Sequence, residues 1–94
     1  MTLYKIYLGL EDNQKRQYTI EEVRNIANIY LKGYTLIPCF GVWEGKPEPS
    51  IIIEFISEDE QGSLPFLIAD IIKEQLNQEA VILTEQQLKE VHYV

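Results

Sequence analysis

The sequence predicts an α+β fold in which two helices cover one face of a four-stranded antiparallel sheet. Three observations lead to this prediction. Short apolar stretches alternate in the manner of strands, two longer stretches repeat at helical spacing, and their order along the chain is β-α-β-β-α-β. With 94 residues the chain is expected to form a single domain over residues 1–94.

The first strand and first helix have the clearest signals. Residues Thr2–Leu10 alternate between two faces, and the polar stretch 11–17 that follows is expected to be a loop. Thr19 and Glu22 form a capping box at the start of the helix, and Gly33 is expected to end it in a left-handed conformation. The apolar stripe of this helix is expected to contain Ile20, Val23, Ala27, Tyr30 and Leu31.

The next two strands are expected to form a hairpin. Tyr34–Trp43 is rich in β-branched, aromatic and aliphatic residues, but it contains Pro38, which cannot donate to a ladder. This strand is therefore expected at an edge of the sheet or with a bulge. The segment Glu44–Pro49 is expected to be a turn-rich connection, and Ser50–Ser57 the second strand of the pair.

The second half of the chain repeats the pattern less sharply. Ser63 is expected to cap a helix that ends near Asn77, and Ala80–Thr84 is expected to be a short strand. The acidic segment Glu58–Gly62 before this helix is expected to be a loop. The apolar stripe of the second helix is expected to contain Leu64, Leu67, Ile68, Ile71, Ile72 and Leu76.

The C-terminal tail has two interpretations. Thr84 and Gln87 could cap a single helical turn, and Val91–Val94 could add a short edge strand. Without the tail, the element order is that of a ferredoxin-like sandwich, with the first and third strands in the centre of the sheet.

The face of the sheet opposite the helices is expected to be rich in apolar side chains. Leu3 and Tyr7 of the first strand and Ile52 and Ile56 of the third would lie on it. Monomers seldom leave so much contiguous apolar surface in water. We therefore expect a homo-oligomer, a trimer or a dimer, with these residues at its interface, although the tail could instead fold over this face.

Charge and composition exclude several functional classes. The net charge is −7 and the basic residues are scattered, which disfavours nucleic-acid binding. No apolar run is long enough to span a bilayer, and the N-terminus lacks the features of a signal peptide. We therefore expect no membrane association and a cytoplasmic location. Cys39 is the single cysteine, so no intramolecular disulfide can form.

The sequence contains no recognisable catalytic set. His92, the single histidine, is expected at the surface or an interface, and Cys39 is expected to be a small buried apolar residue. Zinc and calcium motifs are absent, and the carboxylates of Glu58–Glu60 are expected to be solvated. No glycine-rich nucleotide motif occurs, so no cofactor, metal or catalytic residue is predicted.

The segment between the second and third strands is the most distinctive part of the chain. It combines an aromatic ring, a cation and carboxylates at Trp43, Glu44, Lys46 and Glu48. Such a segment suits contact with a small-molecule or protein ligand. An ordinary hairpin in which Trp43 packs into the core or a subunit interface is the alternative.

This region also carries a resemblance. The run Gly33-Tyr34-Thr35, the turn Gly41-Val42-Trp43-Glu44-Gly45 and the strand entry Glu48-Pro49-Ser50 resemble an uncharacterised family of small ferredoxin-like prokaryotic proteins. More distantly, the layout and Trp43-Glu44-Gly45-Lys46 are similar to the trimeric PII and CutA superfamily. The resemblance implies a trimer in which this loop contacts partners. The loop is much shorter than a PII loop, and the metal-handling histidines and cysteines of CutA are not matched.

Three functions follow from these observations. The first is a non-enzymatic, self-associating binding or regulatory module of the PII-like type. The second is a small enzyme of the dimeric α+β barrel type, with Tyr4, Tyr7, Tyr30, Cys39 and His92 as its polar candidates. The third is an acidic protein-binding inhibitor encoded by a virus or mobile element.

Overall fold

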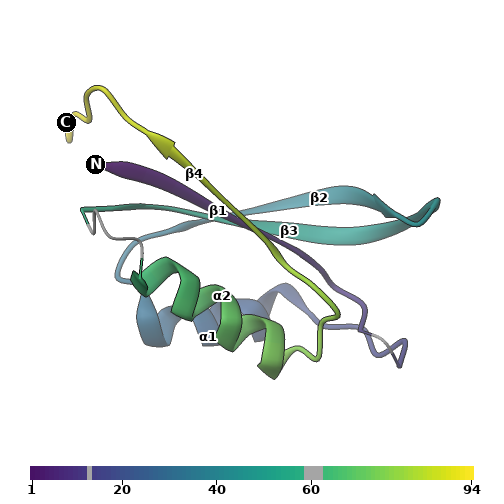
Figure 1. Cartoon of the computed structure of the whole chain (residues 1–94). Helices are drawn as coiled ribbons and strands as arrows, with labels where there is room; N and C mark the ends of the chain where they lie inside the picture. The colour runs from purple at the N-terminus through teal and green to yellow at the C-terminus, as the bar shows by residue number, and fades with distance from the viewer. Residues whose placement is uncertain (13, 59–62) are drawn as a thin grey trace.

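The computed structural model describes residues 1–12, 14–58 and 63–94 and has the predicted α+β architecture. Both helices lie on the same side of the sheet, and the opposite face is open (Figure 1). In chain order the elements are β1 (Thr2–Gly9), α1 (Ile20–Tyr30), β2 (Thr35–Trp43), β3 (Lys46–Ser57), α2 (Ser63–Gln75) and β4 (Ile82–Gln87). Within these described ranges, no helix is long and apolar enough to cross a bilayer.

The sheet has the strand order β2-β3-β1-β4, and each neighbouring pair is antiparallel. This order confirms that the first and third strands are central. It also places Pro38 on the edge strand β2, where its missing N–H breaks no ladder inside the sheet. The register sets Leu3 opposite Ile56 and Tyr7 opposite Ile52, so these side chains share the open face.

The core lies between the sheet and the helices. Alternate residues of β1 and β3 are buried there, and the rings of Tyr4 and Phe55 stack with centroids 5.5 Å apart. The helices contribute Val23, Ile68 and Ile72, each fully buried. The apolar residues that alternate in the strands and those that repeat at helical spacing in α1 and α2 thus pack together in one layer.

The start of α1 follows the predicted capping box. The backbone N–H of Glu22 donates to Thr19 Oγ1 over 3.2 Å, and the N–H of Thr19 donates to Glu22 Oε2 over 2.8 Å. The predicted end of this helix is wrong: Leu31 is the C-cap in an extended conformation, and Gly33 does not have a positive φ. The chain can leave the helix without glycine because an extended cap needs no left-handed residue.

The second helix ends close to Asn77, as predicted, and Asn77 has a left-handed conformation. Asn77 has a φ of 47°, and the N–H of Gln78 donates to the carbonyl of Lys73 over 2.9 Å. This is the hydrogen bond of a Schellman motif. At the other end, Ser63 is the first residue of the helix rather than a cap preceding it. Residues 59–62 of the predicted acidic loop lie outside the described residues.

The hairpin between β2 and β3 is longer and tighter than predicted. Lys46–Pro49, expected in the connection, belongs to β3, and Val42 and Phe40 pair with Pro47 and Pro49. The turn consists of Glu44 and Gly45, which both have positive φ (50° and 77°), as a type I′ turn requires. The prolines are compatible with a strand here because β1 ends at Gly9, so this part of β3 borders no second strand.

The C-terminal segment also differs from prediction. Strand β4 begins two residues later than expected and continues to Gln87, so Thr84 and Gln87 do not cap a helical turn. The predicted tail strand Val91–Val94 is absent: residues 88–94 contain no helix or strand. The pairing with the first strand extends one residue past β4, since the N–H of Leu88 donates to the carbonyl of Met1 over 3.0 Å.

Candidate functional site

A hollow of about 620 Å³ lies at the end of the sheet where β1 leaves and the β2–β3 hairpin continues. The hairpin projects past the helices toward the right of Figure 1. The chain after β1 and the chain before β4 form the other walls, and Gln78 Nε2 joins them by donating to the carbonyl of Glu11 over 3.4 Å. Three parts of the chain, distant in sequence, therefore surround one space.

Small residues on the open face make room for this hollow. Gly9, Gly41 and Ser50 line it, and the side chain of Glu48 lies over the backbone of Gly9. A Cβ built on Gly9 would lie 2.7 Å from Glu48 Oε1. The half-buried carboxylate of Glu48 therefore occupies space that exists because residue 9 has no side chain.

Aromatic and aliphatic side chains stand around this carboxylate. Tyr7 and Trp43 line the hollow, and half of the Trp43 side chain is exposed. Phe40 and Val42 also line the hollow, from the opposite face of the hairpin, where they pair with Pro49 and Pro47, and they are 72% and 68% exposed. The hollow thus has apolar walls and accessible aromatic rings.

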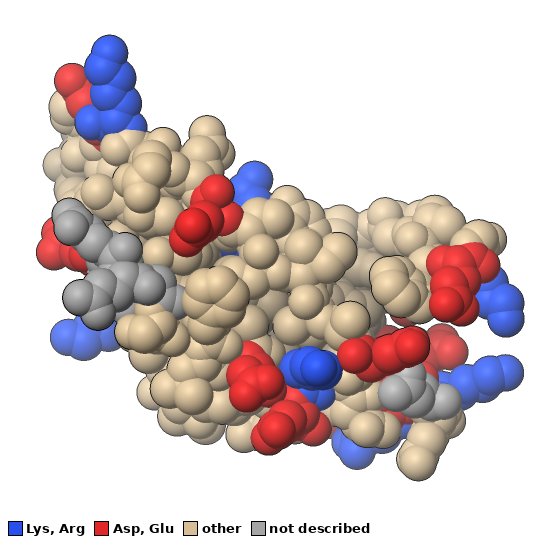
Figure 2. All heavy atoms as spheres, viewed as in Figure 1, with Lys and Arg blue, Asp and Glu red and all other residues tan. Residues whose placement is uncertain are grey.

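The electrostatic character of the hollow is acidic. One basic residue, Lys46, stands among the described residues that line it. The acidic ones are Glu11, Asp12, Glu44, Glu48 and Glu79. Figure 2 shows acidic side chains on both sides of the gap between the hairpin and the chain after β1, with basic side chains at its outer margin. A cationic ligand is therefore favoured over an anionic one.

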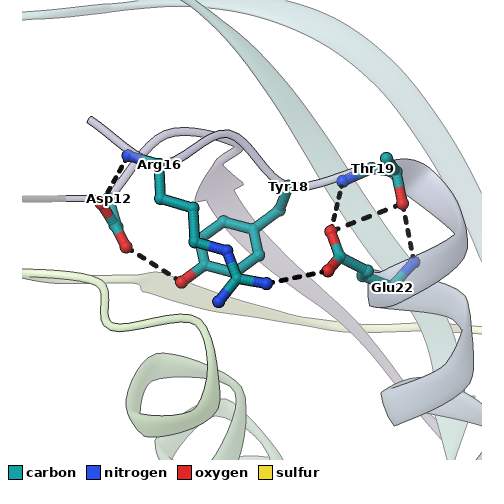
Figure 3. A network of polar contacts seen from close by, with 5 residues as sticks. All are labelled: Asp12, Arg16, Tyr18, Thr19 and Glu22. Atoms are coloured by element: carbon teal, nitrogen blue, oxygen red, sulfur yellow. Dashed lines mark hydrogen bonds and ion pairs between the residues drawn. The ribbon is translucent and has the colours of Figure 1, made fainter. Parts of the chain in front are cut away.

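A polar network holds the chain after β1 in place (Figure 3). The backbone N–H groups of Gln14 and Arg16 donate to Asp12 Oδ1 over 2.8 and 2.9 Å, and the Tyr18 hydroxyl donates to Asp12 Oδ2 over 3.0 Å. The Arg16 guanidinium lies 4.8 Å from the centre of the Tyr18 ring and 3.2 Å from Glu22. Asp12 is thus fixed at the rim of the hollow.

These contacts also change the ionisation of the two central groups. Desolvation raises the pKa of Asp12, but the hydrogen bonds from the amides of Arg16 and Gln14 and from Tyr18 outweigh it, and the pKa is lower than usual. Desolvation, together with the neighbouring Asp12 carboxylate, raises the pKa of Tyr18. Asp12 is therefore an anion, and Tyr18 a neutral donor, over the physiological range of pH.

A second, smaller hollow of about 360 Å³ adjoins the first on the open face, since Tyr7 lines both. Its remaining lining residues are Leu3, Lys5, Thr84, Glu85 and Gln86. Lys5 lies opposite Glu54 on one side and Thr84 on the other. The Lys5 Nζ to Glu54 Oε2 distance is 3.9 Å, and both side chains are about one-third exposed (34% and 31%).

The residues singled out in the sequence are divided between these surfaces. Trp43, Glu44, Lys46 and Glu48 all line the larger hollow. Cys39 also lines it and is half-buried rather than buried, because it lies on the open face opposite Ser50.

The other polar candidates lie elsewhere. His92 is exposed near the C-terminus, with its Nε2 3.2 Å from Glu90 Oε2. Tyr4 is buried in the core, and Tyr30 packs against the core from α1. Of these candidates, Tyr7 and Cys39 are the ones that reach the hollow. Within the described residues, no group of three or more metal-binding side chains is assembled.

Gly9, Gly41, Ser50 and Lys5 were not predicted as site residues. A signal for Gly9 was present in the sequence, because it interrupts the row of larger residues Leu3, Lys5 and Tyr7 on one face of the first strand. Gly41 and Ser50 gave no comparable signal. Their role depends on pairing between strands, which brings them to the same place.

Comparison with known proteins gives a structural likeness. No protein-family model and no curated protein matches the sequence. Among solved structures, a phage SAM lyase in its apo state has the same fold, with a TM-score of 0.75. The two are 24% identical over 90% of this chain and 78% of the lyase chain. At this identity the likeness shows the shared fold.

Proposed function

We propose that this protein is a small phage-type enzyme that binds S-adenosylmethionine in the larger hollow and cleaves it. The observation that carries the proposal is an acidic hollow with exposed aromatic rings, on a fold shared with a phage SAM lyase. Its volume, about 620 Å³, falls within the range typical of small-molecule sites. An enzyme is thus favoured over the non-enzymatic PII-like module.

The positive charge of the substrate is the main feature that the hollow would recognise. The sulfonium of S-adenosylmethionine is a cation that cannot be deprotonated at sulfur. The carboxylate of Glu48 would attract it, and the rings of Tyr7 and Trp43 offer π-faces for cation–π contact. The rim carboxylates of Glu11 and Asp12 raise the local concentration of cations further.

The chemistry of a sulfonium needs little from the protein at the leaving group. When a carbon–sulfur bond breaks, its electron pair goes to sulfur and leaves a neutral thioether, so no acid has to protonate the leaving atom. The carbon takes a new electron pair in exchange from an attacking nucleophile, for which the substrate's own carboxylate oxygen is suited because it carries no proton that has to be removed. An enzyme for this reaction can therefore do without a histidine in its site, and the position of His92 at the surface is compatible with the proposal. A histidine-based site of the α+β barrel type is not needed.

The same reasoning separates binding from catalysis. The positive charge on sulfur diminishes as the bond breaks, so a carboxylate beside it stabilises the bound substrate more than the transition state. Glu48 is therefore expected to lower KM rather than to raise kcat. This sets Glu48 apart from a general base.

The test is titration calorimetry with S-adenosylmethionine and with S-adenosylhomocysteine, which has a neutral sulfur, and mass spectrometry of substrate loss. We expect tighter binding of the sulfonium. Glu48→Gln is expected to raise KM about 10- to 100-fold without lowering kcat. Glu74→Gln, an equal charge change on the exposed side of α2, serves as the control. Absence of binding, or equal affinity for both compounds, would refute the proposal.

We also propose that a second copy of the chain covers the open face, as a dimer or trimer. Leu3, Tyr7 and Ile52 are half-buried there, and Ile56 is 41% exposed. The face continues into the larger hollow, so a second copy would close a site that is open to solvent on one side. Light scattering that finds an 11.0 kDa species at high micromolar concentration would contradict this assembly.

A further inference from the structure

We infer that the paired charges of Lys5 and Glu54 bind the amino-acid end of the substrate, Lys5 its carboxylate and Glu54 its ammonium group. The inference rests on the proposed function and extends it from the cationic sulfur to a second part of the same molecule. It concerns the smaller hollow, which Lys5 lines, and Glu54 beside it. The sequence pattern places Leu3 and Tyr7 of this hollow at an oligomer interface but assigns no ligand to it.

The two charges are complementary to an α-amino acid. A carboxylate and an ammonium group on one carbon present opposite charges side by side, as Lys5 and Glu54 do across the β1–β3 ladder. Their 3.9 Å separation is at the outer limit of an ion pair, and both side chains are about one-third exposed. Each charge can therefore turn toward a ligand with little loss of mutual attraction.

The neighbouring side chains supply donors on the Lys5 side. Thr84 lies directly opposite Lys5 on β4, and Gln86 lies two residues farther along the same face. A hydroxyl and an amide beside an ammonium group provide the donors that a carboxylate accepts. Within the described part of the chain, Glu54 is the one carboxylate that pairs with Lys5.

The order of groups along the open face matches the order of groups in the substrate. Glu48 lies over Gly9, and Tyr7 and Lys5 follow at alternate positions of β1. Alternate residues of a strand are about 7 Å apart, so Lys5 and Tyr7 are close enough for one ligand to reach both. The sulfonium would lie between Glu48 and Tyr7, and its short amino-acid chain would extend over Tyr7 to Lys5.

The test compares S-adenosylmethionine with its decarboxylated form, which keeps the sulfonium but lacks the carboxylate. Affinities are measured by titration calorimetry for the wild type, Lys5→Met, Lys5→Arg and the control Lys32→Met, an exposed lysine after α1. We expect the wild type and the control to prefer the carboxylated compound. Lys5→Met should bind it about 10- to 100-fold more weakly and bind the decarboxylated compound as before. Lys5→Arg should retain the preference.

The outcomes separate this inference from the proposed function. If the wild type binds both compounds equally and Lys5→Met changes neither affinity, Lys5 does not bind the amino-acid end of the substrate. Sulfonium binding in the larger hollow would be unaffected by that result. If Lys5→Met weakens both compounds to the same extent, Lys5 has no role specific to the carboxylate and the inference is overturned. If the wild type binds neither compound, the proposed function fails and the inference with it. Thermal unfolding of each variant verifies that it is folded.

Discussion

Replacement of Gly9 by alanine tests how the larger hollow is built. The added Cβ would lie 2.7 Å from Glu48 Oε1 and 2.8 Å from Glu48 Cδ, closer than real contacts allow. The obstructing atoms are the end of a flexible side chain, so the carboxylate can turn away while the strands keep their places. Gly9→Ala should therefore displace the carboxylate without disrupting the sheet.

The expected effects on stability and on binding differ in size. Alanine in a strand is favoured over glycine by about 0.5–1 kcal/mol, which offsets the cost of moving Glu48. We expect the free energy of unfolding to change by less than about 1 kcal/mol. The displaced carboxylate loses its contact with the bound cation. This loss costs about 1.5–3 kcal/mol of binding free energy, which corresponds to a 10- to 100-fold weaker affinity for S-adenosylmethionine.

Two measurements check this prediction: urea denaturation for stability and titration calorimetry for affinity. Gly33→Ala is the matched control, because a Cβ at Gly33 would meet nothing within 4 Å. In a Glu48→Gln background, Gly9→Ala should weaken binding much less than it does in the wild type, because both changes remove the same contact between the Glu48 carboxylate and the ligand. Wild-type affinity in Gly9→Ala, or a loss of more than about 2 kcal/mol of stability, would refute the reasoning.

Three further predictions concern the turn, the loop after β1 and the open face. Glu44→Asn should raise the free energy of unfolding by about 0.5–1 kcal/mol in urea denaturation, because asparagine tolerates the φ of 50° better than glutamate; an unchanged midpoint would contradict it. The pKa of Asp12 is lower in the folded state than its ordinary value of 3.8, so stability present above pH 4 is lost as the pH falls through the folded pKa. Asp12→Asn should remove this part of the loss of stability at low pH, as measured by the melting temperature between pH 2 and 6. If the melting temperature of the variant falls with pH as steeply as that of the wild type, the prediction is wrong. Ile56→Asp should lower the mass found by light scattering while the dissociated chain still unfolds cooperatively, since the side chain is already 41% exposed in the single chain; an unchanged mass would place the interface elsewhere.

The element order and the faces of the elements could be predicted from the sequence because both depend on local periodicity. The alternation in Thr2–Gly9 separates a buried face from an open one, and the capping box at Thr19 starts the first helix, whatever the rest of the chain does. Pro38 likewise limits its strand to an edge of the sheet or a bulge through its own chemistry, and the structure has it at an edge. A residue's own backbone and its near neighbours determine these features.

The candidate site could be predicted only in part, because its residues meet through strand pairing. Trp43, Glu44, Lys46 and Glu48 were recognised as a distinctive group, but they were assigned to a loop. In the structure Lys46 and Glu48 belong to β3, and their position follows from the register with β2 and from the early end of β1. Local sequence does not contain that register.

The sequence by itself determined the order of the elements and the apolar and polar faces of β1 and β3, and it limited β2 to an edge position or a bulge. Only the tertiary structure decided that the Glu48 carboxylate lies over Gly9 and that Lys5 lies between Glu54 and Thr84. The physical reason is that periodicity specifies which side of a strand meets water, whereas the pairing of strands, set by the packing of the whole core, specifies which side chains stand next to each other there.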